Sequence, residues 1–176
     1  NDWATTTNWD SNSNPSTSAD NVWIPAGLTN YPTSASAVTV NSVTINSGAT
    51  LKAEDDFNGS VTYNRTVNFV DGNLKGWYLM SSPVAGETYD DAYVAANSLA
   101  INGTNNAIAS YVPADDTWSY MQTNGGDTFT AGNGYSVKRS ATGDISFTGT
   151  LNVADVGFTL SNAGNRFNLL GNPYTS

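Results

Sequence analysis

Glu54, Asp56 and Asn58 stand at alternate positions just before Gly59, and side-chain oxygens in this spacing can converge on a hard cation such as calcium. An EF-hand would supply its last carboxylate at the position that Arg65 occupies here, so the segment is not an EF-hand. Calcium loops of β proteins can lack that element, and calcium is therefore the cofactor that the sequence suggests. The alternative is an acidic turn exposed to solvent.

A second group of residues could bind carbohydrate. Trp118 and Tyr120 are two positions apart, so a strand would turn both rings toward one face of a sheet. Asp116, Gln122 and Asn124 lie close by in the sequence and could form hydrogen bonds with sugar hydroxyls. The alternative is that the two rings pack in the core or across strands, where Trp and Tyr are common in small β domains.

The composition excludes several kinds of catalytic chemistry. The chain has no Cys and no His, which rules out disulfides, thiolate metal sites, cysteine nucleophiles and Ser-His-Asp triads. A glycosidase needs two carboxylates held across a cleft, and the chain's two glutamates, Glu54 and Glu87, belong to no recognisable motif. We therefore expect a protein without enzymatic activity.

The charge of the chain argues against two classes of partner. Six basic residues against fifteen acidic ones give a net charge of −9, and six scattered cations cannot neutralise a nucleic-acid backbone or attract an anionic membrane. No apolar run approaches the roughly 20 residues of a membrane span. We expect neither nucleic-acid binding nor membrane insertion.

The elements that must position these residues are predicted to be strands. Residues 1–70 begin with a turn-rich stretch and then repeat a tripeptide of the pattern apolar, Thr, apolar, which predicts short strands. The copies are Val38–Val40, Val43–Ile45, Ala49–Leu51 and Val61–Tyr63. Their short "NS" separators fit either hairpin turns or the corners of a β-solenoid. We predict a short solenoid-like segment or the edge of a sandwich.

Residues 71–176 are predicted to form a second domain. Strand-like segments recur there at about 8–12 residues with Gly, Asn, Asp or Pro between them, which is typical of an antiparallel β-sandwich or barrel-like unit. The segment 88–101 is the one plausible helix, with Thr88 as its cap. The expected fold class is therefore all-β, with at most one short helix, divided into domains 1–70 and 71–176.

One motif of the second domain occurs twice. "GWYLMSSPV" (76–84) returns in altered form as "RFNLLGNPY" (166–174). Neither copy combines a nucleophile with a base or carries a set of metal ligands. We interpret the copies as two related strands near the limits of the second domain, with Leu79 and Leu169 both facing the core.

Four stretches are similar to a β-rich module of large exported proteins of Bacteroidetes, especially flavobacteria. They are "VNSVTINSGATL", "GWYLMSSPVAG", "FTAGNGYSVKRSATGDISFTGTLN" and "FNLLGNPYTS". In those proteins the module commonly precedes a C-terminal sorting domain for type IX secretion. The resemblance covers residues 20–176 and implies an extracellular or cell-surface location, with neighbouring domains of a longer chain as partners. It implies no catalytic residues.

These observations favour a non-catalytic module of a secreted or cell-surface bacterial protein, which serves as a spacer or adhesion domain. One alternative is a carbohydrate-binding module, for which glycans would be the partners. Another is an accessory domain of a polysaccharide-degrading enzyme whose catalytic part lies upstream.

Overall fold

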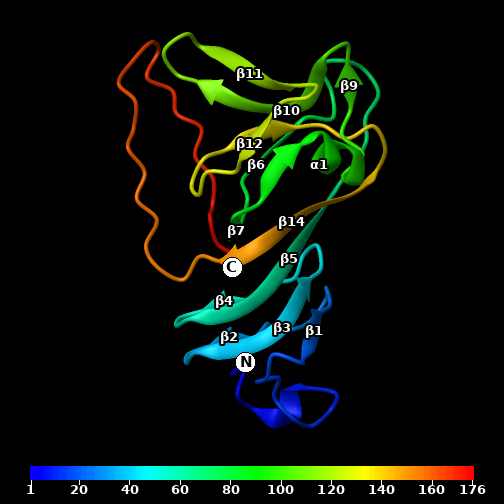
Figure 1. Cartoon of the computed structure of the whole chain (residues 1–176), viewed down its shortest axis with the longest axis vertical. Helices are drawn as coiled ribbons and strands as arrows, with labels where there is room; N and C mark the ends of the chain where they lie inside the picture. Colours follow the sequence, from blue (N-terminus) through cyan, green and yellow to red (C-terminus); the bar gives the residue numbers. More distant parts are fainter.

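Strands of the first half of the chain stack in parallel in the computed structural model, which describes residues 1–176 (Figure 1). One face of the stack consists of β1 (Asn21–Ile24), β3 (Val38–Ile45) and β5 (Phe57–Val67). A shorter parallel face consists of β2 (Thr33–Ser34) and β4 (Lys52–Ala53). Each coil of the chain adds a strand to both faces, which is the architecture of a β-solenoid. The prediction of an all-β chain is confirmed, and of the two alternatives for the first segment the parallel stacking favours the solenoid-like one.

Alternation of side chains along these strands builds the inside of the solenoid. Val43, Ile45 and Val61 are each 0 % exposed, whereas the neighbouring Thr44 and Thr62 are partly exposed and lie on the outer face. Burial of a Val or Ile side chain contributes roughly 1.5–3 kcal/mol. The apolar residues of the repeated tripeptides therefore stabilise the stack, and its threonines keep the outer face polar.

Neither of the first two separators between the tripeptides forms a hairpin turn. Val38–Val40 and Val43–Ile45 lie in one strand, β3, and the intervening Asn41–Ser42 pair is an irregularity at which the register against β5 shifts. This β-bulge restarts the alternation, so that apolar side chains face inward on both sides of it. The third tripeptide, Ala49–Leu51, lies in the turn between the two faces and forms no strand.

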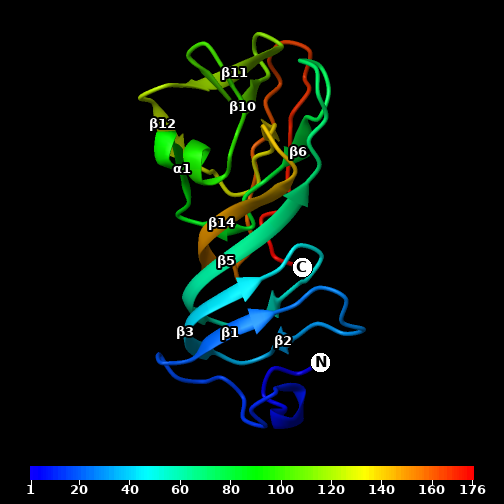
Figure 2. The same ribbon diagram turned by 90° about the vertical axis from the view of Figure 1, so that its right-hand side faces the viewer.

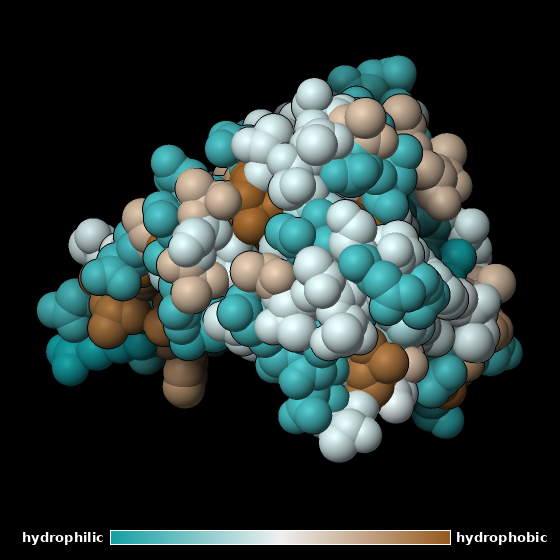
Figure 3. Space-filling view, turned by 90° about the horizontal axis from the view of Figure 1, so that it is seen from below, coloured by the Kyte–Doolittle hydropathy of each residue, from teal (hydrophilic) through white to brown (hydrophobic).

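The loop 4–20, which contains the 3-10 turn η1 (Thr6–Asn8), crosses the open end of the solenoid (Figures 1 and 2). Trp3 is 2 % exposed beneath this loop, and its indole N–H donates to the carbonyl of Pro15 at 2.8 Å. The indole N–H of Trp9 in turn donates to the carbonyl of Trp3 at 2.8 Å. The loop acts as a cap, and the end that it closes is mostly polar or neutral, with small, separate hydrophobic areas (Figure 3).

The opposite end of the solenoid continues into the second half of the chain. β14 (Gly143–Leu151) pairs antiparallel with β5, and β7 (Val84–Ala85) pairs with β14. The hydroxyls of Thr62 and Thr148, 86 residues apart in the sequence, lie 3.0 Å apart across this pair. The sheet β1-β3-β5-β14-β7 thus contains strands from both sides of residue 70. The division into two domains at that residue stays a prediction.

A second sheet has the strand order β11-β10-β13-β6 and is antiparallel throughout. Its strands are β6 (Tyr78–Met80), β10 (Asn105–Val112), β11 (Thr117–Gln122) and β13 (Tyr135–Val137). Three short strands complete the structure: β9 (Ile101–Asn102) pairs with β10, and β8 (Thr88–Asp90) pairs with β12 (Gly126–Thr128). One hydrophobic cluster of buried residues runs from Trp3 through Val61 and Phe147 to Ile108, so both sheets share a core.

The helix α1 (Asp91–Ala96) is shorter than the predicted segment 88–101. Its cap is Asp90, whose carboxylate accepts the N–H of Tyr93 at 2.9 Å, whereas Thr88 lies in β8. An Asp side chain is an effective acceptor at this position. No helix of the structure has the length and apolar character needed to cross a membrane.

The two copies of the repeated motif meet in space. The hydroxyl of Ser81 donates to the carbonyl of Asn172 at 2.6 Å. Only the first copy forms a strand, β6, because the second is limited to one bridge from Leu170. The expected burial of both central leucines is wrong, since Leu79 is 64 % exposed and Leu169 is half-buried. The register of β6 against β13 turns Tyr78 and Met80 toward the core, and Leu79 between them points outward.

Candidate functional site

Four aromatic residues form a row on the second sheet, which we call the aromatic ridge: Tyr111, Trp118, Tyr120 and Trp77. Trp118 and Tyr120 lie on one face of β11 as predicted, the first 39 % exposed and the second half-buried. The Tyr111 ring on β10 lies 5.5 Å from Trp118, and the Trp77 ring lies 5.9 Å from Tyr120, both between ring centroids. Sequence reasoning missed Tyr111 and Trp77, because only the register Tyr111 to Trp118 and the position of β6 bring them beside β11.

Asp116 lies at one end of the ridge, in the tight turn between β10 and β11. One carboxylate oxygen accepts the hydroxyl of Tyr111 at 2.5 Å, and the other accepts the side-chain amide of Asn165 at 2.5 Å. The hydrogen bond from Tyr111 to Asp116 raises the pKa of the Tyr111 hydroxyl. Both oxygens are thus engaged within the chain, and Asp116 orients the ridge instead of offering itself to a ligand.

The other two predicted polar residues are also engaged or turned away. Gln122 accepts the hydroxyl of Thr104 at 3.0 Å and donates to the side-chain oxygen of Asn105 at 2.6 Å. Asn124 has a positive φ of 62° in the turn after β11, and its backbone N–H donates to Asp91 at 2.8 Å. The structure therefore groups the predicted aromatic residues and places the predicted polar residues in supporting positions around them.

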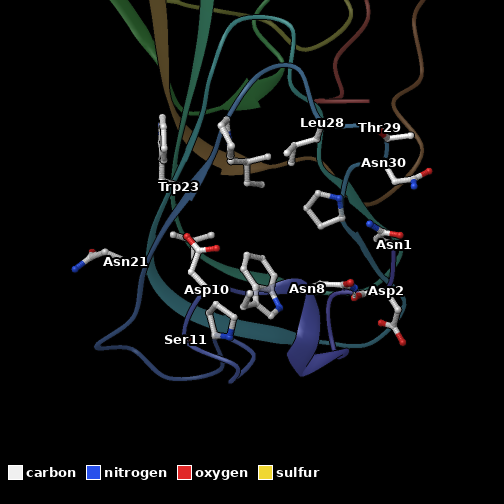
Figure 4. Close-up of a pocket in the computed structure, with 16 residues that line it drawn as sticks. Asn1, Asp2, Asn8, Asp10, Ser11, Asn21, Trp23, Leu28, Thr29 and Asn30 are labelled. Carbon is white, nitrogen blue, oxygen red and sulfur yellow. Dashed lines mark hydrogen bonds between the residues drawn. The ribbon is translucent and has the colours of Figure 1, made fainter.

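A cavity of about 550 Å³ lies at the capped end of the solenoid (Figure 4). We call it the end groove. Its wall comes from three segments: the cap loop with Trp9 and Asp10, strand β1 with Trp23, and the loop after β1 with Leu28. This volume lies within the range of about 300–1,000 Å³ that is common for ligand pockets. The dense Asn, Asp and Ser content of residues 8–20 predicted a loop here but gave no sign of a cavity.

Polar groups without a partner line the end groove. The side chain of Asp10 points into the groove, Thr29 and Asn30 lie at its rim, and none of the three side chains forms a hydrogen bond within the chain (Figure 4). The carbonyls of Asp20 and Ile24 point toward β3, where they accept the backbone N–H groups of Asn41 and Asn46. Backbone groups of successive residues point to opposite sides of a strand, so the N–H and C=O of Trp23 point toward the free edge of β1. The groove can therefore offer both donors and acceptors to a polar ligand.

The residues predicted to bind calcium lie where β4 turns into β5. Glu54 forms an ion pair with Lys52, with 2.5 Å between Oε1 and Nζ. The carbonyl of Asp56 accepts the N–H of Val38 at 2.9 Å, and Asn58 is exposed on β5. Calcium binding stays a prediction, and the melting temperature in calcium and in EDTA tests it.

Glu87 is a carboxylate whose surroundings raise its pKa. It lies between β7 and β8, and its Oε2 accepts the backbone N–H of Thr148 on β14. Partial burial is the largest influence on this group and raises its pKa above the ordinary value of 4.5. Tyr93, which is buried nearby on α1, has its pKa raised well above 10, again mainly by burial.

The chain thus presents two surfaces of different chemistry. The aromatic ridge offers one exposed and three half-buried rings on a sheet, which suits stacking. The end groove offers unpartnered polar groups beside apolar residues, which suits hydrogen bonding to a polar ligand. Comparison of the chain with protein-family models, with curated proteins and with solved structures finds no match.

Proposed function

We propose that the chain is a non-catalytic module of a secreted or cell-surface protein and that it serves there as a spacer or adhesion domain. One observation carries the proposal: a single sheet, β1-β3-β5-β14-β7, joins the capped solenoid to the second half of an elongated molecule (Figure 2). The C-terminus lies against the solenoid, where Thr175 donates to the carbonyl of Leu51 (Figure 1), so tension between the two termini acts on the solenoid and on the core that it shares with the second sheet. A surface of neutral polar side chains keeps such a body hydrated without strong charge.

Force spectroscopy tests the spacer role. The chain is placed between marker domains and pulled from its termini. We expect one rupture event that releases the whole chain, because the solenoid and the second sheet share one hydrophobic core. Stepwise opening at low force, with the solenoid unravelling before the second sheet, would count against a spacer.

Carbohydrate binding is the second candidate function, and the aromatic ridge is the observation that favours it. Trp and Tyr rings on a rigid strand lose little conformational entropy when they stack on a ligand. The hydrogen bond between Tyr111 and Asp116 fixes one end of the row before any ligand arrives. The same surface would suit an accessory domain that holds a polysaccharide-degrading enzyme on its substrate.

A glycan array followed by calorimetry tests this second function. We expect Trp118→Ala to lose binding while its melting temperature stays close to that of the native chain, because Trp118 is 39 % exposed. Trp23→Ala is the matched control, since Trp23 is also exposed but lies at the other end of the molecule. Loss of binding in the control alone would assign the glycan to the end groove. Absence of binding to every glycan would leave only the spacer role.

A further inference from the structure

Lys138 is a buried cation without an acidic partner. It follows β13, is 8 % exposed, and its ammonium donates to the carbonyl of Gly72 at 2.6 Å. The ion pair of the structure joins two other residues, Lys52 and Glu54, and no carboxylate lies within 4 Å of the Lys138 ammonium. Buried charges in proteins are usually paired, because an unpaired charge loses its hydration without compensation.

Lys138 lines a pocket of about 310 Å³ that adjoins the aromatic ridge. Two ridge residues, Trp77 and Tyr120, form part of its wall. The amide side chains on the wall include those of Asn73 and Asn102, which form no hydrogen bond within the chain. We call this cavity the lysine pocket. It combines one cation, two aromatic rings and free amides, which is a different set of groups from that of the end groove.

The donors of the lysine pocket indicate the charge of its ligand. The Lys138 ammonium has three N–H donors; Gly72 accepts one of them, and the Phe69 ring lies 6.0 Å from the nitrogen, so hydrogen-bond donors remain for an anion. A single cation balances a singly charged group such as a carboxylate, whereas a doubly charged phosphate would leave one charge unpaired in a chain of net charge −9.

The walls of the pocket indicate the remainder of the ligand. Trp77 and Tyr120 can contact the apolar face of a sugar ring, and the amides of Asn73 and Asn102 can bond its hydroxyls. We infer that the lysine pocket binds a carboxylate-bearing sugar, of the uronic acid class, with its carboxylate on Lys138. This inference rests on the proposed role of the second sheet in carbohydrate binding and adds the charge class of the sugar.

Trigalacturonic acid and its methyl ester test the inference, because they differ in the carboxylate charge. The native chain, labelled with ¹⁵N, is titrated with each. We expect the acid to shift amide resonances around Lys138, Trp77 and 100–107, and the ester to bind about 10- to 100-fold more weakly, as expected for loss of a hydrogen bond to a charged group. Equal affinity for acid and ester, or shifts confined to other parts of the molecule, would overturn the inference.

Lys138→Met tests the residue itself, since it keeps the apolar stem and removes the charge. We expect the variant to fold, because replacing a buried charge by an apolar side chain is often neutral for stability, and to bind the acid as weakly as the ester. Lys52→Met removes the same charge far from the pocket and should bind like the native chain. Native affinity in Lys138→Met would refute the role of Lys138. Should that variant not fold, the comparison of acid and ester on the native chain decides alone.

The two proposals fail in distinguishable ways. Neutral glycans that bind the native chain should still bind Lys138→Met and should be lost in Trp118→Ala. Binding of neutral glycans without any binding of trigalacturonic acid would overturn the lysine pocket and leave the ridge in place.

Discussion

Replacing Trp3 by alanine should lower the free energy of unfolding by about 4 kcal/mol, because this side chain closes the end of the solenoid. Trp3 is 2 % exposed, and its ring lies 4.7 Å from that of Trp9 and 5.4 Å from that of Phe57, both edge-on. Truncation of a buried aromatic side chain usually costs about 3–5 kcal/mol. The substitution also removes the donor to Pro15, a net loss of roughly 1 kcal/mol within that range.

Collapse of the cap loop into the space left by the Trp3 ring sets the lower limit of the loss in unfolding free energy. The backbone carbonyl that accepts the Trp9 indole is retained in the alanine variant, so the loop can partly collapse into the space left by the ring. Complete collapse would recover about half of the cavity cost, which leaves a loss of about 2 kcal/mol in the free energy of unfolding. A loss between about 2 and 4 kcal/mol is still a large share of the 5–15 kcal/mol that stabilises a typical protein.

Urea unfolding followed by circular dichroism measures the effect. The control is Trp23→Ala, which removes the same side chain from a site that is 63 % exposed and should cost about 0.5 kcal/mol. A loss below 1 kcal/mol for Trp3→Ala, similar to that of the control, would refute the reasoning: it would mean that the cap opens independently and that the solenoid below it is stable without it.

Three further substitutions test other contacts. Gly149→Ala would place a Cβ 2.0 Å from the carbonyl oxygen of Ala85, so we expect it to separate β14 from β7 and to cost at least 1–3 kcal/mol in urea unfolding. Asn97→Ala removes the acceptor of the Ser146 N–H at 2.7 Å and should cost about 1–3 kcal/mol, a value that Asn97→Asp should partly restore. The pKa of Glu87 is raised on folding, so its contribution to the free energy of unfolding falls as pH rises from about 4.5 through the raised pKa. Glu87→Gln should abolish this fall. Parallel profiles of stability against pH for the native chain and the variant would contradict the prediction.

Local alternation is the part of the structure that the sequence predicts well. The pleat of a strand places residues two apart on one face, so the shared face of Trp118 and Tyr120 follows from spacing alone. The buried Val43 and Ile45 follow from the same rule. Such predictions need no knowledge of which strands are neighbours.

Pairing between distant segments could not be predicted in this way. The "NS" at Asn41 fits a turn and a bulge equally well by composition, and only the parallel register against β5 selects the bulge. Trp77 joins the ridge because β6 pairs with β13, a contact that no local pattern encodes. Leu79 faces solvent for the same reason, since one step in register exchanges the two faces of a strand. The lysine pocket depends entirely on these long-range pairings.

The pairing of β14 with β5 also determines when the chain can finish folding. Strands of the solenoid contact strands about 20 residues away, as in the bond from Asn41 to Asn21, so its coils can close early during synthesis. The partner of Thr62 on β5 is 86 residues further along the chain, and Thr175, which donates to Leu51, is 124 residues further.

Until β14 has been synthesised, the 11 residues of β5 form an exposed edge with unpaired backbone groups. The unfinished chain is therefore most prone to aggregate at this edge, and the finished chain lowers the risk by pairing residues 61–67 of β5 with its own last strand.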